Sequence, residues 1–173
     1  MPSAPAGQAL TATVDLAARG ETVSLQDFRG KHVVVYFYPK DDTPGCTKEA
    51  QAFRDLFAEF ERQNVVILGD SPDSAESHGK FCCKYDLPFT LLCDPAKKVM
   101  TRYGAFGEKM MYGKKTTGVI RSTVWIGPDG KVRKHRQRVS SAGDHPAQVL
   151  EAVRAAVAEG SRTAVKGPLG ATP

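Results

Sequence analysis

Long apolar runs are missing from this chain of 173 residues. No stretch approaches the roughly 20 apolar residues that a membrane-spanning helix needs. Residues 1–7 are rich in proline, alanine and glycine, and they carry no apolar core of the kind found in a secretion signal. We therefore expect a cytoplasmic protein that crosses no membrane and works in a reducing compartment.

Cysteine is also scarce, because the chain has only four: Cys46, Cys82, Cys83 and Cys93. A domain of this length buries enough apolar surface to fold without disulfides. The cysteines are therefore expected to be catalytic, metal-binding or core residues rather than a framework of cross-links.

A strong excess of one charge is lacking as well. The formal net charge of +5 is too small to imply nucleic acid binding by itself. The hydrophobic share of 41% and the charged share of 25% are those of a soluble globular protein.

Strand and helix patterns alternate along the chain. Predicted strands cover residues 11–16, 22–25, 32–38, 65–68, 89–93, 119–126 and 131–139, and predicted helices cover residues 44–63, 72–85, 96–103 and 144–159. The glycine-bearing, basic segment at residues 104–118 is predicted to be an irregular loop. The alternation indicates an α/β fold with a partly parallel sheet. A turn at residues 128–130 adds a hairpin, so the sheet is expected to be mixed.

The same pattern predicts the domain organisation. Residues 1–160 are expected to form a single domain, because no internal repeat or linker divides them. Residues 161–173 have the composition of a flexible tail.

Cys46 stands where a helix is predicted to begin, directly after the apolar strand at residues 32–38. Thr43 is a suitable N-cap and Pro44 suits the first helical position. Unpaired backbone N–H groups and the helix dipole at this end favour a thiolate. Ligands also bind at the carboxyl ends of strands in such sheets. The spacing alone leaves a second interpretation open, in which Cys46 is a small apolar residue continuing the stripe of Phe53 and Phe57.

The segment PKDDTPGCTKEA at residues 39–50 resembles the active-site loop of the peroxiredoxins, and most closely the Q-type branch, also called bacterioferritin comigratory protein. The family spacing of proline, threonine and cysteine is met by Pro39, Thr43 and Cys46. The resemblance extends over about residues 6–158. It implies a thioredoxin-like fold with an N-terminal β extension, and thiol-dependent reduction of hydrogen peroxide and organic hydroperoxides.

The resemblance also implies roles for single residues. Cys46 would be the peroxidatic cysteine, whose thiolate becomes a sulfenic acid. The Thr43 hydroxyl and the Cys46 N–H would hold the peroxide, and Pro39 would limit access of water. Arg121 would lie beside Cys46 and orient the peroxide. A second interpretation of Arg121 is a structural ion pair with Glu49, since a buried arginine needs a partner; the two roles are compatible.

A second thiol must resolve the sulfenic acid. Some Q-type members carry it five residues after the first cysteine, but Gln51 stands at that position here. The segment around Cys82 resembles the one that carries the resolving cysteine on the next helix in other members, so the resemblance selects Cys82, with Cys83 as second choice. Cys93 is expected to be a buried structural thiol. Because a disulfide needs Cα atoms within about 7 Å, the two helices are expected to loosen on oxidation.

Other functions were weighed against this one. His78, Cys82 and Cys83 give a weak pattern for a metal site, and no histidine is singled out as the base of a cysteine hydrolase. The cationic stretch at residues 131–138 suits a charged edge strand better than a nucleic acid contact. A thiol-based redox sensor or chaperone would use the same cysteines.

The sequence therefore predicts a peroxiredoxin that needs no cofactor or metal. Cys46 and Cys82 would form an intramolecular disulfide, and the resemblance points to thioredoxin as its reductant, with glutaredoxin as the alternative. A monomer is expected, because resolution within one chain requires no second subunit.

Overall fold

The computed structural model describes the backbone of residues 11–13 and 22–171 and the side chains of residues 27–158. Its strands are β1 (Thr11–Thr13), β2 (Thr22–Ser24), β3 (His32–Phe37), β4 (Val65–Ser71), β5 (Thr90–Cys93), β6 (Phe106–Met111), β7 (Lys114–Val119), β8 (Ser122–Ile126) and β9 (Val132–Arg136). Its helices are the short 3₁₀ turn η1 (Leu25–Phe28), α1 (Pro44–Asp55), α2 (Phe57–Arg62), α3 (Ala75–Tyr85), α4 (Lys98–Arg102) and α5 (His145–Ala171).

The core of the fold is a five-stranded sheet in the order β5-β4-β3-β8-β9. Strands β3, β4 and β5 are parallel, whereas β8 is antiparallel to β3 and β9 is antiparallel to β8. The sheet is therefore mixed, and the α/β, thioredoxin-like architecture predicted from the sequence is confirmed. β9 is an edge strand, as predicted, and its Arg133 and Lys134 are exposed.

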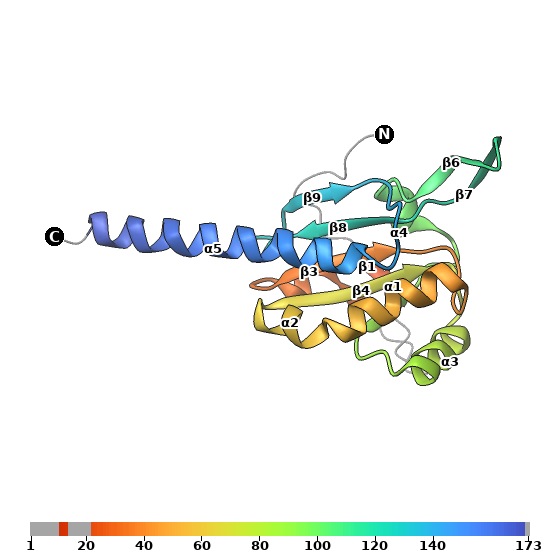
Figure 1. The fold of residues 1–173 in the computed structure, drawn as a ribbon, viewed down its shortest axis with the longest axis horizontal. Coiled ribbons are helices and arrows are strands. Elements are labelled where there is room, and N and C mark those ends of the chain that lie inside the picture. Colours follow the sequence, from red (N-terminus) through yellow and green to blue (C-terminus); the bar gives the residue numbers. More distant parts are fainter. Residues whose placement is uncertain (1–10, 14–21, 172–173) are drawn as a thin grey trace.

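Strand β3 is the central strand, and its residues alternate between two apolar layers. Val33, Val35 and Phe37 face a cluster that includes residues of α4, while Val34 and Tyr36 face a cluster that includes residues of α1, α2, α3 and α5. Burial on both faces explains why this strand has an unbroken apolar sequence. In Figure 1 the helices of the second cluster lie along one side of the sheet.

The N-terminal extension is a small antiparallel pair of β1 with β2. The predicted hairpin is thus present with strands shorter than expected, and its connecting residues 14–21 lie outside the described residues. Among the described helices, none combines the length and the apolarity that crossing a membrane would require.

Three of the predicted helix boundaries differ from the structure by three residues or more. The helix expected over residues 44–63 is divided at Leu56, whose φ of −100° and ψ of 4° depart from helical values. The helix predicted to start at residue 72 is α3, which begins at Ala75, because the Ser74 side chain caps it by accepting from the Ser77 N–H. The last helix extends to Ala171, so residues 161–171 continue it (Figure 1), since a helix propagates more easily than it starts.

The segment expected to be a loop at residues 104–118 is also different. It contains most of a hairpin of β6 with β7, whose turn places Tyr112 and Gly113 at φ of 53° and 77°. Two residues with positive φ are the requirement of a tight hairpin turn. Among the strands that the structure describes, β6 and β7 pair only with each other, and they are largely exposed. The hairpin therefore has no alternating apolar pattern by which the sequence could have revealed it.

Candidate active site

The carboxyl end of β3 is where the predicted site residues meet. The loop after β3 carries Pro39 and Thr43, and α1 then places Cys46 in its first turn. Phe37 pairs with Ser122 across the sheet, which puts Arg121 at the same edge. The sequence predicted Arg121 within a strand at residues 119–126, and this was wrong. Arg121 lies at the break between β7 and β8, where its carbonyl accepts from the Val139 N–H.

Cys46, Arg121 and Glu49 form a compact charged group. The Arg121 guanidinium donates through Nη2 to the Cys46 sulfur at 3.3 Å and through Nη1 to Glu49 Oε1 at 2.8 Å. Cys46 is 1% exposed, and the Glu49 side chain is fully buried. A single cation therefore contacts both the sulfur and a carboxylate, which is the arrangement that stabilises negative charge on sulfur.

Two opposing effects act on the pKa of Glu49. Burial raises the pKa of its carboxyl to about 7, although the Arg121 guanidinium lowers it. Its Oε2 atom has no hydrogen-bond partner among the residues that the structure describes. Arg121 itself remains charged, because Glu49 and Cys46 raise its pKa against the effect of burial.

Gly45 makes the close approach of Arg121 possible. A Cβ atom at this position would lie 3.1 Å from Arg121 Nη2. The absence of a side chain thus leaves room for the guanidinium beside the first turn of α1.

Thr43 occupies the N-cap position, as predicted, but its side chain makes no capping hydrogen bond to the helix. Its hydroxyl donates instead to the Lys40 carbonyl oxygen at 2.8 Å. The hydroxyl proton is therefore engaged, while the oxygen lone pairs remain available as acceptors.

A hollow of about 360 Å³ adjoins Arg121 and Pro39. Its other walls come from the β6–β7 hairpin and the segment after β9: Lys109, Met110, Met111, Val119, Ile120, Arg138 and Val139. The hollow is therefore partly apolar and partly cationic.

All four cysteines are free thiols. Cys82 on α3 is partly buried against the apolar cluster that contains Cys46, whereas Cys83 is exposed. Burial, the Asp41 carboxylate and Cys83 raise the pKa of Cys82 to about 11. Cys93, expected to be buried, is half-buried at the end of β5.

The sequence did not reveal a polar network between the Cys46 loop and α3. The Asp41 carboxylate contacts Tyr38, Ser77 and His78, and Asp42 binds Lys84 and Tyr85. One signal was present: His78 lies on the apolar stripe of α3, where an imidazole needs a partner. The aspartates are 36 to 43 residues away in the chain, so their pairing could not be read from spacing.

The residues of the alternative metal and hydrolase sites have other neighbours in the described structure. Among the described residues, the group that could hold a metal is Asp41, Asp73 and His78 rather than His78 with Cys82 and Cys83. Its members are already hydrogen bonded to protein groups. The remaining histidines lie elsewhere: His32 contacts Trp125, His145 contacts Thr123, and the ring nitrogens of His135 on β9 have no hydrogen-bond partner among the described residues.

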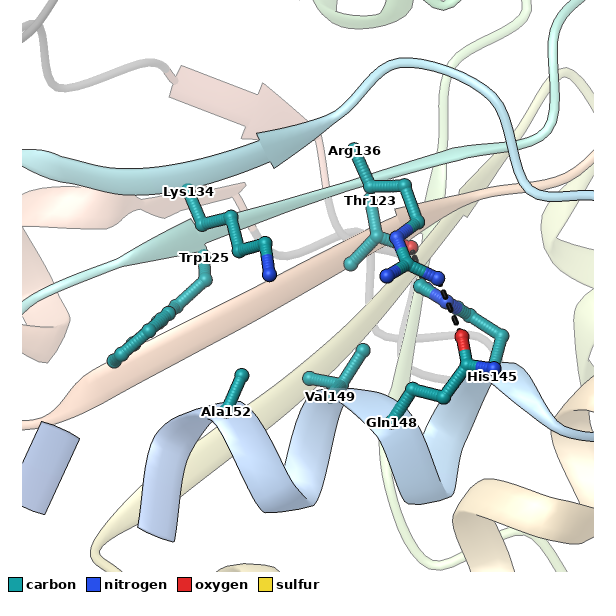
Figure 2. A pocket seen from close by; sticks show the side chains of 8 residues that line it. All are labelled: Thr123, Trp125, Lys134, Arg136, His145, Gln148, Val149 and Ala152. Carbon is teal, nitrogen blue, oxygen red and sulfur yellow. Dashed lines mark hydrogen bonds between the residues drawn. The ribbon is translucent and has the colours of Figure 1, made fainter. Parts of the chain in front are cut away.

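A second hollow lies between β8, β9 and α5 (Figure 2). It is lined by Thr123, Trp125, Lys134, Arg136, His145, Gln148, Val149 and Ala152. Its volume of about 20 Å³ has space for about one water molecule. It is therefore too small to be a substrate pocket.

Comparison with known proteins gives one consistent result. Residues 5–135 match the model of the AhpC/TSA family. Peroxiredoxin Bcp of Bacillus subtilis is 45% identical over 135 residues, which are 78% of this chain and 85% of the relative.

Solved structures agree with the sequence relatives. Peroxiredoxin Q of Xanthomonas campestris superposes with a TM-score of 0.77 at 36% identity, covering 86% of this chain and 91% of that chain. A PrxQ variant of Xylella fastidiosa gives a TM-score of 0.79 at 30% identity, covering 90% and 98%. A ligand-complex structure of the Xanthomonas campestris protein, described by its alkyl peroxide reduction activity, has a TM-score of 0.77 at 35% identity, covering 86% and 92%.

Proposed function

This chain belongs to the AhpC/TSA family and is a peroxiredoxin, a thiol peroxidase, and on that premise we propose that it reduces peroxides through Cys46 and Cys82, with thioredoxin as the final electron donor. One observation carries the proposal for Cys46: the Arg121 guanidinium contacts both the sulfur of this buried residue and Glu49. The same geometry gives each residue of the group a chemical task.

In the first step the Cys46 thiolate attacks one oxygen of the peroxide. A sulfur–oxygen bond forms, the O–O bond breaks, and the leaving oxygen takes a proton to become water or an alcohol. Cys46 is oxidised to a sulfenic acid. Arg121 stabilises the thiolate and then the negative charge that develops as the O–O bond breaks.

The loop before Cys46 positions the peroxide. The Thr43 hydroxyl donates a hydrogen bond to the Lys40 carbonyl oxygen, so the lone pairs of its own oxygen can accept the hydrogen of the peroxide O–H group. The Cys46 N–H belongs to the first turn of α1, where backbone donors have no partner within the helix, and it would be a second group that holds the peroxide. Pro39 restricts water, and the hollow beside it leaves space for the carbon chain of an organic hydroperoxide.

In the second step the Cys82 sulfur attacks the sulfenic sulfur of Cys46. A disulfide forms and the oxygen leaves as water. Cys82 is preferred to Cys83 because it packs against the cluster that holds Cys46, while Cys83 faces solvent. The two thiols lie on separate helices, so α3 and the first turn of α1 have to loosen before the bond can form.

An external dithiol protein then reduces the disulfide. Thioredoxin is the proposed donor and glutaredoxin the alternative. The cycle requires no metal or cofactor and can be completed within one cytoplasmic monomer. A second candidate function, redox sensing, would use the same disulfide but would give little sustained turnover.

Peptide mapping without reductant, after treatment with one equivalent of peroxide, tests the assignment of the thiols. Wild type and Cys83→Ser should both yield the Cys46–Cys82 disulfide and sustain turnover with thioredoxin. Cys82→Ser should stop after one oxidation of Cys46. An intramolecular disulfide and normal turnover in Cys82→Ser would disprove the role of Cys82, and a disulfide without turnover would favour the sensor.

A further inference from the structure

Helix α3 has to move for the proposed disulfide to form, and polar contacts fix it to the loop that carries the reacting cysteine. Asp41 and Asp42 lie five and four residues before Cys46. Asp41 contacts Ser77 and His78 in the first half of α3, and Asp42 contacts Lys84 and Tyr85 in its last turn. The two halves of the helix are therefore held by neighbouring residues of one loop.

The two attachments differ in burial. His78 and Asp41 have side chains that are 1% and 3% exposed, and His78 Nδ1 lies 2.6 Å from Asp41 Oδ2. Lys84 and Asp42 are 57% and 44% exposed. Surface ion pairs contribute little, whereas removing one partner of a buried pair is costly. The Asp41–His78 pair is therefore the dominant attachment.

The hydrogen-bond geometry of His78 requires a charged ring. Nδ1 faces the Asp41 carboxylate, and Nε2 lies 3.0 Å from the Leu92 carbonyl oxygen. Both neighbours are acceptors, and a neutral imidazole has only one N–H to donate. Only the imidazolium satisfies both contacts, so loss of its proton removes one of the two bonds that join α3 to the Cys46 loop and to β5.

The geometry points to the Asp41–His78 pair as a proton-controlled latch that holds α3 in place and thereby sets how fast Cys82 reaches the oxidised Cys46. Asp41 and His78 are positioning residues in this inference, because neither contacts the reacting sulfur. The inference rests on the proposed function in that it takes Cys82 as the resolving thiol.

The latch also affects the chemistry of Cys82. The Asp41 carboxylate contributes, after burial, to raising the pKa of the Cys82 thiol to about 11. When α3 moves away from Asp41, both causes weaken and the thiolate becomes easier to form. The movement that brings Cys82 toward Cys46 thus also makes it a better nucleophile.

The direction of the pH dependence follows from the groups that face His78. Asp41, the Leu92 carbonyl and Asp73 together raise the pKa of His78 above its ordinary value of 6.5, although burial opposes them. The Tyr38 ring also packs nearby, and its hydroxyl donates to Asp41. The stabilisation is therefore complete below pH 6.5 and is lost as the pH rises through the raised pKa of His78.

A single-turnover experiment tests the latch with His78→Gln and Asp41→Asn. Reduced protein is mixed with hydrogen peroxide at pH 6, and sulfenic acid and disulfide are quantified over time. Because a charge-assisted buried bond is lost, disulfide formation should be about tenfold faster in both variants. In His78→Gln this gain should shrink as the pH rises, whereas Asp41→Asn, which also removes the charge near Cys82, should stay faster at every pH.

The matched control is Glu76→Gln. It breaks the Glu76–Lys80 pair, whose members are 79% and 78% exposed and both lie on α3. This variant should form the disulfide at the wild-type rate. A purely structural weakening of α3 by His78→Gln would give the same acceleration at every pH, and that result would overturn the latch.

Hydrogen exchange separates the latch from the proposed function, because it needs no peroxide. At pH 6 the amides of α3 in the reduced protein should exchange about tenfold faster in Asp41→Asn than in wild type. Wild-type α3 should itself exchange faster above the pKa of His78, after correction for the intrinsic effect of pH. Unchanged exchange would reject the latch. A wild-type protein with the expected exchange but no Cys46–Cys82 disulfide would reject only the proposed function.

Discussion

The proposed role of Arg121 depends on its fork, which contacts the Cys46 sulfur and Glu49 at the same time. Lysine could supply the charge but not both contacts in one plane. Gly45 is part of the same arrangement, since a side chain there would crowd the guanidinium.

Replacing Arg121 by glutamine should slow the oxidation of Cys46 by about 100-fold, because a preorganised charged donor at the reacting atoms is lost. Arg121→Lys should retain part of the rate. The measurement is the second-order rate constant with hydrogen peroxide under single-turnover conditions. Arg133→Gln on the exposed edge strand β9 is the matched control, and a loss within about threefold for Arg121→Gln would remove Arg121 from the proposed chemistry.

At the scale of elements, close packing between strands and side chains fixes the sheet beneath the site. Tyr36 on β3 stacks on Tyr38 and Phe53, and Gly69 on β4 lies against the Tyr36 ring. A Cβ atom at Gly69 would lie 2.7 Å from Leu91 Cδ2 and 3.0 Å from Tyr36 Cζ. The glycine is therefore required by the approach of neighbouring side chains.

Gly69→Ala should lower the free energy of unfolding by about 1–3 kcal/mol, because the added methyl group overpacks the core. Urea unfolding of the reduced protein measures this. Gly143→Ala is the control, since a Cβ there would meet no atom within 4 Å. Equal stability of the two variants would contradict the packing argument.

Across the whole molecule, buried ionisable groups determine how stability depends on pH. His145, at the start of α5, is 1% exposed, and its Nδ1 has no hydrogen-bond partner within the described part of the chain. Burial, followed by the charges of Arg136 and Arg121, lowers its pKa to about 4. Figure 2 shows its ring and the Arg136 side chain at the same small hollow.

His145 is harder to protonate in the folded protein than in the unfolded chain. The free energy of unfolding therefore decreases as the pH falls from 6.5 toward 4. The difference between the two pKa values corresponds to about 3 kcal/mol. His145→Gln should therefore lose about 3 kcal/mol less stability than wild type between pH 7 and pH 4. Urea unfolding at both pH values measures the two losses, and equal losses would contradict this role.

Buried carboxyl groups act in the opposite direction. Burial raises the pKa of Glu49 to about 7 and raises that of Asp70 above its ordinary value, with Asp94 adding to the effect on Asp70. A folded-state pKa that is raised in an acid stabilises the protein at low pH, and this stabilisation is lost as the pH rises. Acid stability is thus a balance between these carboxyls and His145.

The sequence by itself determined the strand at residues 32–38, the helix that starts at Pro44 and the position of Cys46 in the first turn of that helix. These features depend on signals within a few residues: apolar periodicity, a proline at the first helical position and a turn before it. The hairpin of β6 with β7 was not predicted, because its strands are largely exposed and, within the described part of the chain, pair only with each other.

Only the tertiary structure decided which partners meet. Arg121 lies 75 residues from Cys46, and His78 lies 37 residues from Asp41, yet each pair is in contact. Such contacts depend on strand order and register, here the pairing of Phe37 with Ser122 and the packing of α3 beside the loop after β3. Local sequence carries no signal for them, because the two partners are far apart in the chain and become neighbours only through the order and register of the strands.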